Sequence, residues 1–592
     1  MRIASWAVCA IVFGLACSAA AQIPKLRLAE VQDVSPTRYG LELSVDPEQA
    51  QFTGTVQISL DVRKPLATLW LNASDLTIQE ATLSAAGKQQ TAKAAASGPD
   101  LLNLQFESMV PSGPAELRIR YSGKIRQDTG GVFRLEDLGN KYLFTQFEAT
   151  EARVAFPCFD EPSYKVPWQL TLHVPAQDKA VSNTPVIREM AEGQTKTYIF
   201  QETNPLPSYL VAFAVGPLEF VDAGKAGKNH VPVRIVVPKG RGEEAKYAAE
   251  ITATILTRLE NYFGIPYPYK KSDQVAIPAP FGGMENAGMV TYGQDLLLAK
   301  PATDSIQRQR NYASVAAHEL AHQWFGDLVT TAWWNDSWLN EAFATWMEQK
   351  ILADWKPEWK TSLDDVQSLL GAERGDSLVS ARKIRQEITS KGDIDNAFDT
   401  ITYNKGAAVI GMFESWVGPR EFQNGIHSYL ERHAFRNATA GDFLDAIGTA
   451  SKKDVSKAFS TFLDQPGVPL VSVALDCGDK TPVLHLAQSR YVPAGSQATG
   501  NQVWQIPVCV RSSTSSQPTC LLLSAAKTDV PLKEARSCPQ WVEVNADAKG
   551  YYRVDYQGGL LSSLTANASA LSDAERTELM GSVQAMAAGG KL

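Results

Sequence analysis

The residues best suited to chemistry in this chain of 592 residues are two histidines with two glutamates near them. His318 and His322 are four residues apart, so on a helix both imidazoles lie on one face and can bind one metal ion. Glu341 would be the third protein ligand, and three ligands with one open position are typical of a catalytic zinc. Glu319 would lie beside the ion, where it could take a proton from a bound water. The pattern predicts a hydrolase with one zinc ion per chain.

Two helices joined by a turn would have to position these side chains. Residues 314–325 carry both histidines and have apolar side chains at helical spacing, including Val315, Leu320 and Trp324. Residues 335–337, an Asn-Asp-Ser triplet, are suited to capping a second helix that brings in the third ligand. The alternative is an amphipathic core helix whose histidines only satisfy hydrogen bonds.

Four other segments, taken together with the histidines, are similar to a known family. In chain order they are Thr-Gln-Phe-Glu at 145–148, Phe-Pro-Cys-Phe-Asp-Glu-Pro at 156–162, Phe-Gly-Gly-Met-Glu-Asn at 281–286 and Tyr-Asn-Lys-Gly-Ala at 403–407. They resemble the gluzincin zinc aminopeptidases typified by aminopeptidase N. The resemblance extends from about Tyr39 to the end of the chain. It implies an enzyme that removes single residues from the N-termini of peptides.

The resemblance implies a role for each residue of the metal site. His318, His322 and Glu341 would bind zinc, and Glu319 would act as the general base. Tyr403 would donate a hydrogen bond to the oxyanion that forms during hydrolysis. A tyrosine among apolar residues more often packs in a core with its hydroxyl satisfied, so the role of Tyr403 depends on the resemblance.

The resemblance also implies a pocket for the free α-amine of a peptide. Glu148 and Glu285 would hold the amine, because a buried ammonium forms strong charge-assisted hydrogen bonds with carboxylates. Two carboxylates at a fixed distance from the metal would select the terminal peptide bond and exclude internal ones. The residues that would shape this pocket are Gln146, Gly282, Gly283, Met284 and Asn286. Taken alone, Glu285 could cap its glycine-rich turn, and Glu148 could be a solvated charge at the end of a strand.

Other classes of protein could carry the same metal motif. A lipid-epoxide hydrolase or a zinc endopeptidase would use it for a different reaction, and a non-catalytic protein could retain zinc for binding. The carboxylate of Glu148 beside Gln146 disfavours the first two, and the intact Glu319 and Tyr403 disfavour the third. A net charge of −8 gives no support for a nucleic-acid partner. No feature predicts an oligomeric state.

The N-terminus has the pattern of a secretory signal. A basic residue precedes an apolar run over residues 3–15, and three alanines at 19–21 form a small-residue cleavage site. The run is too short to remain as a transmembrane helix, and no other run approaches that length. Gly14 disfavours a lipid anchor at Cys17. We therefore expect a signal peptide over residues 1–21 and export to the periplasm or the extracellular space.

Four of the seven cysteines lie close together late in the chain: Cys477, Cys509, Cys520 and Cys538. In an exported protein such a group suggests two disulfides, which can be paired in three ways. Residues 503–510 and 520–523 have strand patterns around a serine-rich turn, and a symmetric hairpin places Cys509 opposite Cys520. We predict Cys509–Cys520 and, by elimination, Cys477–Cys538. Free thiols in a β core are the alternative.

The chain as a whole has the pattern of a multidomain α+β protein. Alternating apolar and polar residues predict an N-terminal antiparallel β-sandwich over residues 22–222, and the Gly/Lys-rich segment 224–229 is a candidate linker or loop. Helical spacing dominates much of residues 223–465, where the resemblance implies a thermolysin-like α/β catalytic domain. Strands return in a small β-sandwich over 466–555. Residues 556–592 begin a helical domain that looks truncated, so we expect a fragment of a longer protein.

Overall fold

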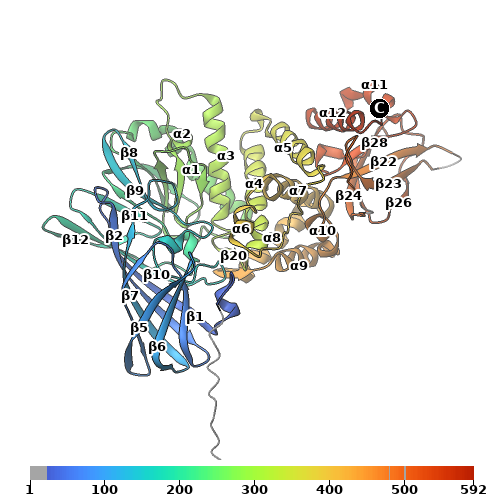
Figure 1. Ribbon diagram of the computed structural model, residues 1–592. Coiled ribbons are helices and arrows are strands. Elements are labelled where there is room, and N and C mark those ends of the chain that lie inside the picture. The colour runs from blue at the N-terminus through green and yellow to red at the C-terminus, as the bar shows by residue number, and fades with distance from the viewer. Residues whose placement is uncertain (1–22, 479–480, 499–501, 592) are drawn as a thin grey trace, which may run out of the picture.

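The computed structural model describes residues 23–478, 481–498 and 502–591, with β-rich regions on either side of a helical centre (Figure 1). The predicted signal peptide, residues 1–21, lies outside the described residues. Among the described helices, none has both the length and the apolar character needed to cross a bilayer. The predicted multidomain α+β class is confirmed at this level, with an N-terminal β-rich region, helices and several separate sheets.

A ten-stranded sheet forms most of the N-terminal region (Figure 1). In spatial order its strands are β12 (Val186–Glu192), β13 (Thr195–Phe200), β10 (Trp168–Pro175), β1 (Val34–Ser44), β2 (Gln51–Val62), β7 (Gly113–Lys124), β4 (Thr77–Ala85), β5 (Lys88–Ser97), β6 (Leu101–Val110) and β3 (Leu66–Asn72). Apolar and polar residues alternate along its strands, which gives the sheet one buried face. In β2, Val56, Ile58 and Leu60 are buried, and the residues between them are more exposed. β1 and β10 pair in parallel, which corrects the purely antiparallel prediction. β10 reaches β1 through a long crossover rather than a hairpin, and parallel pairing requires such a connection.

Two smaller sheets carry the strands that end near the candidate site. The first contains β11 (Lys179–Ser182), β14 (Phe213–Gly216), β9 (Asn140–Gln146) and β8 (Gly131–Asp137). The second contains β15 (Leu218–Ala226), β16 (Val231–Pro238), β17 (Ser272–Ile277), β19 (Met289–Gly293) and β18 (Gly283–Met284). The candidate linker or loop 224–229 is a loop: it forms the end of β15 and its turn into β16. Gly227 has a φ of 66° in this turn, a conformation that glycine adopts without strain.

Helix α1 (Lys246–Phe263) packs an apolar face against this second sheet. Ala248, Ile251, Ile255 and Leu259 are all buried on that face. Gly264 ends the helix in the left-handed conformation, and its N–H donates to the Glu260 carbonyl at 2.9 Å.

The helices from α2 to α10 fill the centre of the molecule and connect to its C-terminal part (Figure 1). They are α2 (Gln294–Leu297), α3 (Ile306–His322), α4 (Ser337–Trp355), α5 (Thr361–Asp376), α6 (Lys391–Asp395), α7 (Gly406–Val417), α8 (Pro419–His433), α9 (Ala440–Ser451) and α10 (Val455–Leu463), with a π-helical turn η7 (Ile401–Lys405) before α7. Two short strands, β20 (Val329–Thr331) and β21 (Arg436–Ala438), pair in parallel beneath them. α3 packs on α4, and α4 on η7 and α7, so three separate segments meet at one place.

Two sheets return after α10. One contains β26 (Lys527–Pro531), β23 (Val483–Arg490), β22 (Pro469–Asp476) and β28 (Arg553–Tyr556), and the other contains β25 (Ser515–Leu523), β24 (Ile506–Ser512) and β27 (Val542–Glu543). Helices α11 (Leu560–Ala566) and α12 (Asp573–Ala588) follow, and α12 packs on α5 (Figure 1).

The structure confirms both predicted disulfides. Cys509 and Cys520 are directly paired across β24 and β25, with Cα atoms 4.0 Å apart, and Cys477 bonds Cys538 with Cα atoms 5.5 Å apart. The turn between the two strands is shorter than predicted, because β25 begins at Ser515 and the serine-rich segment extends the strand.

Candidate active site

The two predicted helices exist, but their limits differ from the prediction. α3 begins at Ile306 rather than 314 and ends at His322 rather than 325. Its N-terminal residue is fixed by the Ser305 hydroxyl, which accepts a hydrogen bond from the Arg308 N–H at 3.1 Å. The first turns are polar, so apolar periodicity could not indicate them. α4 begins at Ser337, yet the Asp336 side chain accepts from the Ala440 N–H at 2.9 Å instead of capping its own helix.

Three donor atoms from α3 and α4 form a small triangle. The Nε2 atoms of His318 and His322 are 3.1 Å apart, and each is 3.4 Å from Oε2 of Glu341. Ligand atoms around a tetrahedral zinc, at about 2.0–2.1 Å from it, are separated by about 3.3 Å. The three side chains therefore fit a zinc ion without rearrangement.

The other ring nitrogen of each histidine has its own partner. Nδ1 of His322 lies 2.9 Å from the carbonyl oxygen of Phe325, and Nδ1 of His318 lies 3.3 Å from Oε2 of Glu348. Such partners fix the tautomer and the ring orientation, so that Nε2 faces the metal position. No sequence motif pointed to Glu348, although Glu348 follows Glu341 by seven residues, which is two turns along the same helix face.

The buried carboxylates around the histidines favour positive charge between them, carried either by protons on the imidazoles or by a bound cation. Burial opposes a proton on His322, but Glu285 and Glu341 together raise the pKa of His322 to about 10. Burial would likewise raise the pKa of Glu341, yet the two histidines lower it to about 2. A divalent cation between these groups would replace the shared protons.

Glu319 lies beside the triangle and packs against the backbone of β18. A Cβ atom built on Gly283 would come within 2.1 Å of the Glu319 carboxylate, whereas one on Gly282 would meet nothing within 4 Å. Gly283 thus leaves the space that the Glu319 carboxylate occupies. Burial raises the pKa of Glu319 to about 8, and a cation in the triangle would lower it again.

Two further carboxylates lie on the His322 side of the triangle. Glu285 follows β18, and its Oε1 is 4.0 Å from Nδ1 of His322. Oxygens of Glu148, Glu285 and Glu341 all lie within 4.8 Å of one another. Burial raises the pKa of both Glu148 and Glu285, and Glu285 raises that of Glu148 further. Oε1 of Glu285 is buried with no hydrogen-bond partner among the described residues, so this end of the site can accept a cationic donor.

A buried glutamine holds the Glu285 segment in place. Gln323 donates from Nε2 to the Glu285 carbonyl at 2.7 Å, and its Oε1 accepts from the Gly288 N–H and the Tyr267 hydroxyl, both at 3.0 Å. Gln323 directly follows His322, so α3 positions the two histidines and also the loop opposite them.

The structure brings most of the predicted site residues to one cavity of about 460 Å³. Those that line it are Glu148, Gly282, Gly283, Glu285, His318, Glu319, His322, Glu341 and Tyr403. The Tyr403 ring, on η7, stacks 6.1 Å from that of His318. Gln146, Met284 and Asn286 do not line the cavity: the first donates to the Met284 sulfur at 3.3 Å, and Asn286 donates to the Thr291 hydroxyl at 3.4 Å.

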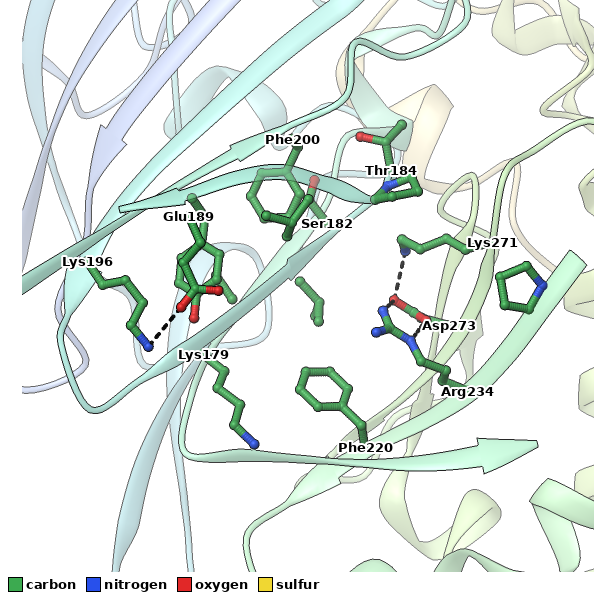
Figure 2. A pocket seen from close by; sticks show the side chains of 16 residues that line it. Lys179, Ser182, Thr184, Glu189, Lys196, Phe200, Phe220, Arg234, Lys271 and Asp273 are labelled. Atoms are coloured by element: carbon green, nitrogen blue, oxygen red, sulfur yellow. Dashed lines mark hydrogen bonds and ion pairs between the residues drawn. The ribbon is translucent and has the colours of Figure 1, made fainter. Parts of the chain in front are cut away.

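A larger cavity, of about 570 Å³, lies elsewhere and has paired charges (Figure 2). In Figure 2, Asp273 lies against Arg234 at 2.7 Å and Lys271 at 2.8 Å, and Glu189 faces Lys196 at 3.3 Å. None of the predicted site residues lines this cavity. Size therefore does not identify the reaction site in this molecule; the residue chemistry does.

Comparison with known proteins gives the family. Two protein-family models match the chain. The model described as "Peptidase M1 N-terminal domain" matches residues 35–210, and the model described as "Peptidase family M1 domain" matches residues 247–462. Aminopeptidase M1 of Arabidopsis thaliana is 34% identical over 552 residues, which cover 89% of this chain and 62% of that protein. Aminopeptidase M1-A of Oryza sativa subsp. japonica is 33% identical (94% and 64%), and glutamyl aminopeptidase of Rattus norvegicus is 31% identical (94% and 60%). The chain spans about three fifths of the length of these relatives.

The matched regions contain the segments that the sequence analysis singled out. Residues 145–148 fall within the N-terminal match, and residues 281–286, the histidines and residues 403–407 fall within the second match. Both descriptions name one family, and the relatives align across both regions, so the chain belongs to peptidase family M1.

Proposed function

We propose that this chain is a zinc-dependent aminopeptidase that removes the first residue from peptides with a free N-terminus. The observation that carries the proposal is a triangle of metal-binding donor atoms beside the two carboxylates Glu148 and Glu285 in one cavity. The aminopeptidase names of the relatives point in the same direction.

His318, His322 and Glu341 would hold one zinc ion, for which their donor atoms already have suitable spacing. When bound, zinc supplies a Lewis acid and brings the pKa of its water to about 7.

The remaining residues would bind the substrate and move a proton. Glu148 and Glu285 would bind the ammonium group, because it neutralises two carboxylates that repel each other. Glu319 would accept a proton from the attacking water and pass it to the leaving amine. Tyr403 would donate its hydroxyl proton in a hydrogen bond to the carbonyl oxygen as negative charge develops there. Gln146, Met284 and Asn286 would support the amine pocket from behind its wall.

The carboxylate pair favours this function over the alternatives. An endopeptidase must leave room for a chain on both sides of the cleaved bond, and an epoxide hydrolase does not need an ammonium site. A non-catalytic zinc protein has no use for a carboxylate at Glu319 that the Gly283 backbone accommodates. Two disulfides fit export, and we place the protein in the periplasm or outside the cell. The division at 22–222, 223–465, 466–555 and 556–592 belongs to the same proposal.

A panel of chromogenic aminoacyl anilides, each unblocked and N-acetylated, tests the function. We expect release of the aniline only from unblocked substrates, its loss with a zinc chelator, and its recovery when zinc is added back. Hydrolysis of the acetylated substrates would contradict the amine pocket, and hydrolysis that chelation leaves unchanged would contradict the metal site.

A further inference from the structure

A second cavity, of about 300 Å³, continues the active-site cavity along α3. The two share wall residues, namely Glu348, Gln349 and Ser368. The second is lined farther on by Asn311 and Gln307, which lie toward the N-terminal end of α3. Together the two cavities form a groove, hereafter the α3 groove.

Contacts along α3 give the groove a direction. The ammonium-binding end lies at His322, which is 4.0 Å from Glu285. One turn earlier, His318 contacts Glu348, and two turns farther on Arg310 forms an ion pair with Asp364 of α5 at 2.6 Å. A peptide whose amine is held beside His322 must therefore extend past the metal position toward α5.

The distance along the helix sets which substrate residue reaches the second cavity. Asn311 precedes His318 by seven residues, or about 10 Å of helix at a rise of 1.5 Å per residue. An extended peptide covers about 10 Å with three residues. The second cavity therefore faces the third and fourth residues of a peptide that is cleaved after its first.

The charges in the second cavity are unbalanced. Its lining includes Arg310, which the carboxylate of Asp364 already neutralises, and Asp365, which is half-buried. No described cation lies within ion-pair distance of Asp365, although the charge of Lys549 acts on it more weakly. Thr361, only 7% exposed, lines the same cavity, and its buried hydroxyl has no hydrogen-bond partner among the described residues. A carboxylate and a free hydroxyl together suit a primary ammonium or a guanidinium.

We propose that this end of the α3 groove is a subsite for a lysine or arginine side chain at the third or fourth residue of the peptide, held by Asp365 and Thr361. The proposal rests on the proposed aminopeptidase function and adds a substrate class to it. It predicts that the enzyme prefers peptides that are basic near, but not at, their N-terminus.

Two sets of amidated pentapeptides test the subsite: Leu-Ala-Xaa-Ala-Ala and Leu-Ala-Ala-Xaa-Ala, with Xaa as lysine, norleucine or glutamate. The readout is the ratio of kcat/KM for leucine release between the lysine and norleucine peptides. We expect a ratio of roughly five in at least one set, as a partly solvated ion pair provides. Asp365→Asn should bring the ratio to about one, and Asp365→Lys should invert the ranking in favour of glutamate. Glu358→Gln is the matched control, since Glu358 is an exposed acid just before α5 that lines neither cavity.

A binding measurement separates this proposal from the proposed function. The lysine and norleucine peptides are titrated calorimetrically into Glu319→Gln, which removes the base but keeps the groove. If no peptide is hydrolysed, the aminopeptidase function fails, and the ratio of the two Kd values still tests the subsite. If every peptide is hydrolysed without regard to charge, or if Asp365→Asn keeps the lysine preference, the subsite fails and the aminopeptidase function stands.

Discussion

The two ends of the α3 groove both present carboxylates, but in different surroundings. At the His322 end, Glu285 is 3% exposed and has an oxygen without a partner, and Glu148 lies beside it. At the α5 end, Asp365 is half-buried and Asp364 is exposed and already paired. A buried charge that loses its partner costs far more than a solvated one. We therefore expect that a substrate must present an ammonium group at the His322 end, whereas a basic side chain at the α5 end only increases the rate.

The largest effect should come from weakening the first end. Glu285→Gln should lower kcat/KM for an unblocked aminoacyl anilide by roughly 10³-fold, since removal of one partner from a buried charge pair costs about 2–5 kcal/mol. Steady-state kinetics on the unblocked substrate measures this, with Glu358→Gln as a folded control. A loss smaller than tenfold would show that Glu285 does not hold the amine, and the contrast between the two ends would disappear.

Adjacent glycines provide a smaller effect with a built-in comparison. Gly283→Ala places a methyl group against the Glu319 carboxylate, at 2.1 Å before any shift, so the base must move. We expect kcat to fall by roughly 10²-fold, because small displacements of a catalytic group have large effects on rate. Gly282→Ala adds the same methyl group in open space and should have a much smaller effect on kcat. Equal losses in the two variants would mean that the position of Glu319 is not set by Gly283.

Removal of the Glu348 side chain tests the histidine geometry. Glu348→Ala should weaken zinc binding by about 10–100-fold, the usual effect of losing an outer partner of a histidine ligand. Competition with a zinc-binding dye measures the affinity directly. Gln349→Ala, one residue along α4, should leave zinc affinity unchanged, since Gln349 makes no described contact with either histidine. If Glu348→Ala kept its zinc affinity, Glu348 would be a lining residue of the groove without a role in orienting His318.

The smallest effect is a pH dependence of the lysine preference. Burial raises the pKa of Asp365 to about 7, with Lys549 opposing this and Glu348 and Asp364 adding to it. A raised pKa means that Asp365 is charged above pH 7 and neutral below it, so the lysine-to-norleucine ratio should rise from about one at pH 5.5 to its full value at pH 8.5. The ratio should be independent of pH in Asp365→Asn, and the same slope in that variant would assign the titration to another group.

Local sequence patterns predicted the features that depend on neighbouring residues. The spacing of His318 and His322 predicted that their rings lie together, because helix geometry alone places them on one face, and their Nε2 atoms are 3.1 Å apart. The hairpin pattern gave Cys509–Cys520, since opposite positions in paired strands are close. The limits of α3 were wrong, because its first turns are polar and its N-terminal cap is a hydrogen bond that periodicity does not indicate.

The resemblance to a family named residues that no local pattern could assign. Glu148 taken alone had the pattern of a solvated strand end, yet it meets Glu285 and Glu341 in one cavity. That contact joins the segment after β9 to the segment after β18, and these two strands belong to different sheets. For a similar reason composition alone could not decide whether residues 224–229 are a linker or a loop: the strands they join pair with each other, so the segment is the loop of a hairpin.

The sequence by itself determined that His318 and His322 share one helix face and that Cys509 lies opposite Cys520, because these relations follow from the periodicities of helix and strand within a few residues. Only the tertiary structure decided that Glu348 orients His318, that Gly283 leaves room for Glu319, and that Asp365 lies at the far end of the same groove. These relations join α3 to α4, β18 and α5. Distance along the chain does not specify distance in space, so packing of the hydrophobic core had to set them.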